Sequence, residues 1–150
     1  MDIQKLHTQA MELAEQADFL KMQGNNEEAN KLYAQSLDAE RQAAYEAREQ
    51  HFGEPTESVL FRSAASLAYG LQDLRESERL VCMGLAGNPP QEIANELRDL
   101  FDKVSMDRSL KQLDGITKEK QSEEVTITIP IQERNLLRVL VRKFGWACIF

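Results

Sequence analysis

The chain has 150 residues, 42% of them hydrophobic and 29% charged, and 18 Lys and Arg against 25 Asp and Glu give a formal net charge of −7. This composition excludes wholesale disorder, and the acidic balance argues against nucleic-acid binding by the chain as a whole. The charge is uneven, because residues 1–124 carry 14 basic and 24 acidic groups (−10) while residues 125–150 carry four and one (+3). We therefore expect a helical body and a chemically distinct tail.

Helical periodicity dominates the body. Apolar residues recur every three or four positions over residues 3–20, and Gly24 with two asparagines then supplies a helix stop and a new start. The next stripe, over residues 29–47, meets no helix breaker before Gly53 and Pro55, which predicts an unusually long second helix. Three further helices are predicted over residues 56–71, 74–86 and 90–104. Five helices joined by short turns predict a mainly α fold of antiparallel hairpins.

The residues of these hairpins resemble the tetratricopeptide repeat, whose pattern of small and aromatic positions spans two helices. In the first copy the matching positions are Leu13, Gln16, Ala17, Leu20, Ala29 and Tyr33. In the second copy they are Phe61, Ala64, Ala65, Ala68, Ser77 and Val81, with Pro89 at the closing position. The corresponding turns, at Gly24 and Gln72, lie 48 residues apart rather than the 34 of the repeat. The resemblance implies two divergent repeats in a right-handed stack, with a longer second helix and a capping fifth helix.

Such a stack implies a concave groove, lined by the first helix of each hairpin, that binds a protein or peptide partner. The partner-binding positions implied by the resemblance are Asp18, Lys21, Met22, Arg62, Ser66 and Tyr69. Met11, Ala14, Val59 and Gly70 occupy further groove-facing places, and among them Met11 and Val59 are expected to be packing residues.

The tail has another character. Residues 125–129 alternate β-branched and hydroxyl side chains, which predicts a strand, and an amphipathic helix and a short terminal strand follow. The sequence thus predicts a helical domain over residues 1–117, a linker over 118–124 and a strand–helix–strand appendage over 125–150. We expect the appendage to serve self-association, as in a homodimer, or contact with a second partner.

This layout resembles the opening of ribbon-helix-helix DNA-binding proteins and the ends of small bacterial antitoxin-type proteins. The resemblance implies an alternative function, a regulator whose basic tail contacts DNA. Under it, Thr126 and Thr128 face bases while Arg134, Arg138 and Arg142 meet phosphate. The alternative interpretation of these arginines is a solvated helix face.

Little in the sequence predicts catalysis. His7 and His51 are isolated on polar stretches, Cys82 lies in an apolar pattern typical of a small buried residue, and the carboxylates fall on solvent faces of helices. We therefore expect no metal, no cofactor and no enzymatic activity. Because no apolar run approaches the roughly 18 residues of a membrane span, and the N-terminus turns polar, we expect a cytoplasmic protein-interaction scaffold without a transmembrane segment.

Overall fold

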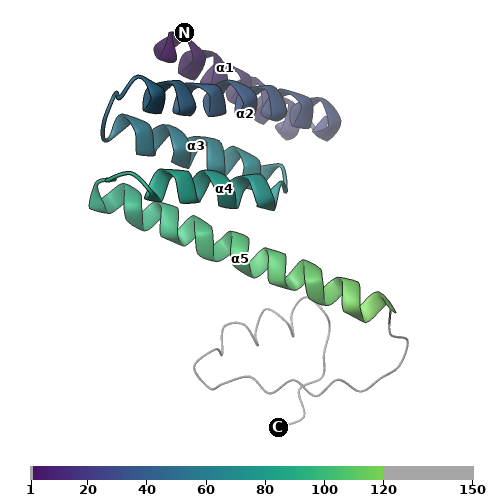
Figure 1. Cartoon of the computed structure of the whole chain (residues 1–150). Helices are drawn as coiled ribbons and strands as arrows, with labels where there is room; N and C mark the ends of the chain where they lie inside the picture. Colours follow the sequence, from purple (N-terminus) through teal and green to yellow (C-terminus); the bar gives the residue numbers. More distant parts are fainter. Residues whose placement is uncertain (1, 120–150) are drawn as a thin grey trace. The chain divides into compact units, whose positions relative to one another are not determined.

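The computed structural model describes residues 2–119, which are mainly α-helical and include no strand. The five helices are α1 (Ile3–Met22), α2 (Asn26–Glu49), α3 (Thr56–Gly70), α4 (Leu74–Leu85) and α5 (Gln91–Glu119). Within the compact unit of residues 1–115, successive helices run antiparallel, each beside the one before it (Figure 1). The five predicted helices and the long second one are confirmed. The strand–helix–strand appendage predicted for residues 125–150 lies outside the described residues.

The fifth helix is longer than predicted. It continues to Glu119, past residue 104 where the apolar stripe ends and into the first residues of the expected linker. Residues 105–119 contain no proline and only one glycine, Gly115, so nothing in their local sequence stops the helix. The prediction erred because it took the end of an apolar stripe for the end of a helix.

The turns inside the two hairpins share one geometry. Between α1 and α2, Gly24 has φ +81°, its N–H donates to the Lys21 carbonyl at 3.0 Å, and the Asn25 N–H donates to the Leu20 carbonyl at 2.9 Å. Both bonds are those of a Schellman motif, which closes the C-terminus of a helix.

Between α3 and α4, Gln72 repeats this arrangement with φ +63°. Its N–H donates to the Tyr69 carbonyl at 2.9 Å, and the Asp73 N–H donates to the Ala68 carbonyl at 3.0 Å. The left-handed conformation suits Gly24, whereas Gln72 adopts it against its side-chain preference. Asp73 also accepts the Glu76 N–H as an N-cap, while Asn25 makes no side-chain cap bond.

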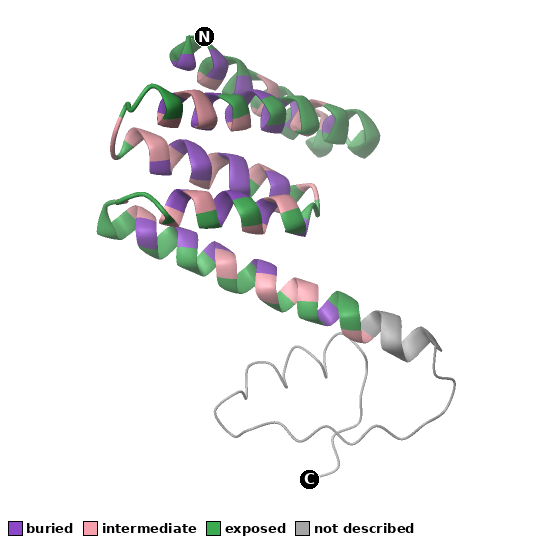
Figure 2. Ribbon diagram, in the orientation of Figure 1, coloured by how far each residue is buried: buried purple, intermediate pink, exposed green. Residues whose placement is uncertain are grey.

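Small residues lie where the helices of each hairpin face one another. Ala17 and Ala29 are fully buried in the first hairpin, and Ala65 and Ser77 are fully buried in the second, with the Ser77 hydroxyl donating to the Ala65 carbonyl at 2.8 Å. Figure 2 shows the buried positions along the inward faces of the helices. Small side chains at these positions let the two helices of each hairpin approach closely.

The larger core side chains gather around the second hairpin. Phe61 on α3 is fully buried, and its ring meets that of Tyr45 on α2 edge to face at 5.3 Å between centroids. Gly84 on α4 brings Leu97 of α5 close, since a Cβ there would lie 3.0 Å from Leu97 Cδ1 and 3.2 Å from Phe61 Cβ. Through Leu97 the fifth helix joins the same core cluster as α2, α3 and α4.

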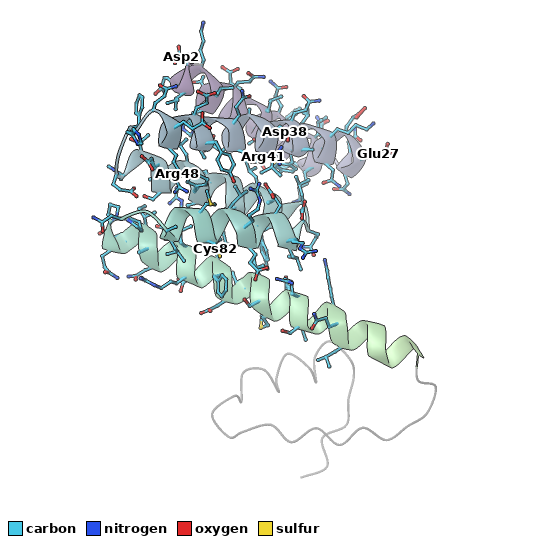
Figure 3. All side chains as sticks on the ribbon, in the orientation of Figure 1. Asp2, Glu27, Asp38, Arg41, Arg48 and Cys82 are labelled. Carbon is cyan, nitrogen blue, oxygen red and sulfur yellow. The ribbon has the colours of Figure 1, made fainter. Side chains whose placement is uncertain are left out.

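Two arginines of α2 reach the fourth helix, and both are labelled in Figure 3. Arg41 pairs with Glu76 at 3.3 Å, and Arg48 donates to the Met83 carbonyl at 2.6 Å while its guanidinium lies 4.3 Å from the centre of the Phe61 ring. These contacts connect the two hairpins along one side of α2.

Cys82 is exposed on α4, so the prediction that it is a small buried residue is wrong. The buried stripe of this helix runs through Ser77, Val81 and Gly84, and Cys82 lies outside it. At about 100° per residue, Cys82 projects away from its buried neighbour Val81.

Candidate partner-binding groove

A groove of about 420 Å³ opens over α2, between walls supplied by α1, α3 and α5. Apolar and hydroxyl side chains make up most of its lining, with one acidic residue on α2, one basic residue on α3 and one of each on α5. The lining residues are Ala10, Met11, Ala14, Ser36, Glu40, Arg62, Ser63, Ser66, Leu67, Glu96, Leu100 and Lys103. This hollow includes two of the predicted partner-binding positions, Arg62 and Ser66.

The groove positions predicted on α3 are held against α5. Arg62 forms an ion pair with Glu96, and the Ser66 hydroxyl donates to the Arg62 carbonyl at 2.9 Å. The Tyr69 hydroxyl donates to Asp107 at 3.0 Å, and burial together with this bond raises the pKa of Tyr69. Arg62 and Ser66 therefore line the groove on its α3 wall, whereas Tyr69 lies outside the lining. Residues of α5 engage the polar groups of Arg62 and Tyr69.

The positions predicted on α1 lie away from the groove lining, near the end of the helix. Asp18 accepts a hydrogen bond from the Tyr33 hydroxyl, which raises the pKa of Tyr33 to about 12. The Lys21 ammonium lies 5.7 Å from the centre of the same ring, and the Met22 side chain is 87% exposed. The structure thus separates the six predicted positions into an α1 group and an α3 group.

Two α1 residues that were given less weight line the groove itself. Met11 is 47% exposed, so the prediction that it is a packing residue is wrong, and Ala14 lies one turn beyond it in the same lining. Val59 on α3 is half-buried and does not line the groove. An exposed methionine on a groove wall offers a flexible apolar surface that adapts to a bound side chain.

The structure reveals a polar pair that sequence reasoning missed. Glu40 on α2 is buried, and its Oε2 atom lies within hydrogen-bond distance, 2.9 Å, of Nδ1 of His7 on α1. Burial raises the pKa of Glu40, while hydrogen bonds from His7 and Ser63 and the charge of Arg62 oppose that rise. The prediction that His7 is isolated and that carboxylates keep to solvent faces is therefore wrong at this pair.

A signal for Glu40 was present in the sequence. Glu40 follows Ser36 and Leu37 by four and three residues and precedes Ala43 and Ala44 by three and four, so it lies within the buried stripe of α2. Its partner had no such signal, because His7 lies 33 residues away in the chain.

The described residues hold no metal-binding cluster and no membrane-spanning helix. They contain no group of three or more His, Cys, Asp or Glu side chains placed to hold a metal ion, and His51 lies exposed in the turn before α3. None of the described helices has the length and apolar character needed to cross a membrane. The tail positions Thr126, Thr128, Arg134, Arg138 and Arg142 fall outside the described residues.

Comparison with known proteins adds no relative. The chain matches no protein-family model, no curated protein and no solved structure. Function must therefore be argued from the groove and the surface of this chain.

Proposed function

We propose that this protein is a non-enzymatic, cytoplasmic protein–protein interaction module that binds a segment of a partner protein in the groove over α2. The observation that carries the proposal is the groove itself, walled by three alternate helices, α1, α3 and α5, and about 420 Å³ in volume. Exposed Met11 and the half-buried Leu67 supply apolar contact area, and Arg62, Ser66 and Lys103 supply polar groups at the walls. This mixture suits a peptide better than a small polar metabolite.

The resemblance to tetratricopeptide repeats supports the same function. In such stacks the first helix of each hairpin lines the binding surface, and here the corresponding helices are α1 and α3. The two hairpin turns, at Gly24 and Gln72, have the same hydrogen bonds, but this motif also ends α2 at His51. The proposal of two related units therefore rests on the sequence pattern. The tail would add self-association or a second contact.

Affinity capture from native cytosol tests the groove. The bait is the full chain, compared with a Met11→Glu, Lys103→Glu double variant that places two acidic groups on opposite walls. Both side chains are exposed, so the changes leave the core intact. We expect a defined set of proteins to lose at least about tenfold in recovery, because charge is introduced where apolar and basic contacts form.

The matched control is a Cys82→Glu, Lys111→Glu double variant, which makes the same charge change at exposed positions outside the groove. Partners specific to the groove should be recovered equally by wild type and control. Equal recovery by all three baits would overturn the proposal.

The difference in charge between the tail and the rest of the chain favours one alternative function. This alternative is a transcriptional or antitoxin-like regulator with a DNA-binding tail. Only residues 125–150 are basic, at +3 against −10 for the rest. A gel shift with genomic fragments tests it, since a specific reader retains selective complexes as salt rises from low to physiological concentration. Loss of every complex over that range would exclude the alternative.

A further inference from the structure

A second hollow, separate from the groove, lies on the free flank of the first hairpin. It has a volume of about 480 Å³ and is lined by α1 together with one residue of α2. Its lining residues, which we call the flank slot, are Glu12, Glu15, Gln16, Phe19, Leu20 and Leu32. Phe19 is 62% exposed, and together with Leu20 and Leu32 it gives the slot an apolar surface.

The positions of the second hairpin that correspond to the flank slot are covered by other helices. Because the two hairpin turns correspond at an interval of 48 residues, the slot positions Glu12, Gln16 and Leu32 correspond to Leu60, Ala64 and Leu80. All three of these counterparts are buried in the core.

The neighbours of α1 and α3 account for the difference. The third helix packs against α2 on one side and α4 on the other, whereas α1 lies at the edge of the described helices and packs against α2 (Figure 1). The flank slot is therefore the face that, on α3, a preceding helix covers.

The charges of the flank slot restrict what can cover it. Glu12 and Glu15 lie one turn apart on α1, and within the described residues neither carboxylate has a hydrogen bond or an ion pair. Asp18 follows one turn further along the helix and is engaged by Tyr33. A helix with an acidic surface like that of α2 would be repelled here, and a helix with Lys or Arg beside an apolar stripe would be attracted.

We propose that the flank slot docks a basic amphipathic helix of a partner protein, which packs on the first hairpin as α2 packs on α3. Its apolar stripe covers Phe19, Leu20 and Leu32, and its basic residues pair with Glu12 and Glu15. This surface is independent of the groove, so each can fail experimentally without the other.

Fluorescence anisotropy with two synthetic helices of about 20 residues tests the proposal. Both peptides carry the same Leu and Ala stripe, and their polar positions are Lys in one and Glu in the other. Full-length protein at physiological salt should bind the Lys peptide and not the Glu peptide. A Glu12→Lys, Glu15→Lys variant should bind the Lys peptide at least about tenfold more weakly and should gain affinity for the Glu peptide.

Two matched controls separate docking from general attraction between a cation and an acidic protein. An Asp99→Lys, Asp102→Lys variant reverses two exposed charges on α5, away from the slot, and should bind as wild type does. Phe19→Ser should weaken binding of the Lys peptide, whereas Phe52→Ser should not, although Phe52 is 59% exposed against 62% for Phe19. Equal losses in the two charge variants, or in the two serine variants, would overturn the proposal.

Discussion

The two helical hairpins share their turns and their close helix contacts, yet they differ in what surrounds them. The second hairpin holds large, fully buried side chains such as Phe61 and Leu80. The first hairpin buries alanines with a few aliphatic side chains, and its helices also make polar contacts, such as the hydrogen bond from the Ser36 hydroxyl to the Ala10 carbonyl and the contact of His7 with Glu40. Neighbouring helices account for the difference, because α3 and α4 are covered by both α2 and α5 while α1 keeps an open flank. Local sequence thus sets the form of a hairpin, and its neighbours set how it is stabilised.

The largest expected effect contrasts Phe61 with Leu13, its counterpart 48 residues earlier. Phe61→Ala should lower the free energy of unfolding by about 4 kcal/mol, because it leaves a cavity at a fully buried site. Leu13→Ala, at a half-buried site, should cost roughly 1–2 kcal/mol. Urea unfolding measures both, and equal losses would mean that the first hairpin is as tightly packed as the second.

The approach of α5 to the second hairpin is tested at Gly84. A methyl group there would meet Leu97 and Phe61 at 3.0–3.2 Å. Gly84→Ala should therefore destabilise by about 1 kcal/mol, because overpacking exceeds the gain in helix propensity. Gly70→Ala is the control, since nothing lies within 4 Å of its added methyl, and it should stabilise by about 0.5 kcal/mol. A Gly84→Ala protein more stable than wild type would show that α5 shifts to accommodate the added methyl group at little cost.

The two hairpin turns differ in the N-cap of the helix that follows each of them. Asp73→Ala should cost about 1 kcal/mol, because the carboxylate of Asp73 accepts the Glu76 N–H at the start of α4. Asn25→Ala should cost less, since the Asn25 side chain makes no such bond to α2. The shift of the urea midpoint compares the two variants, and a larger loss at Asn25 would contradict the assignment of caps.

The smallest effect is expected at Glu40, where hydrogen bonds partly offset burial. Because burial raises the pKa of Glu40, the folded chain retains this proton more readily than the unfolded chain. The resulting stability is present below the ordinary carboxyl pKa of about 4.3 and is lost as pH rises through the raised folded value. The stability of wild type relative to Glu40→Gln should therefore fall as the pH rises above about 4.

Urea unfolding at a series of pH values measures this difference, and Glu15→Gln corrects for the loss of one exposed carboxylate. A difference between wild type and Glu40→Gln that rises with pH would contradict the sign assigned to the Glu40 carboxyl.

Most of the helical fold was predictable because its boundaries are encoded locally. Gly24 stops α1, Pro55 precedes α3, and Pro90 precedes α5, and each acts through the backbone of its own segment. Apolar spacing of three and four likewise placed the buried faces. The end of α5 escaped prediction because residues 105–119 carry neither a helix stop nor a clear stripe.

The candidate sites were less predictable, because they depend on residues far apart in the chain. The pair of His7 and Glu40 joins two helices, and the groove needs walls from α1, α3 and α5 at once. Of the six positions that a repeat pattern predicted in the groove, Arg62 and Ser66 line it, whereas Asp18, Lys21, Met22 and Tyr69 do not. A pattern of positions along one helix does not specify how far a neighbouring helix extends or what it covers.

The second helix has a consequence for how the molecule unfolds. It packs against α1 and against α3, and its Tyr45 and Arg48 both contact the ring of Phe61. Melting α2 therefore removes an interface from each hairpin, while melting α1 removes one interface only. Amide hydrogen exchange should find α1 opening by itself, and α2 opening only together with α3 and α4, as a single cooperative block.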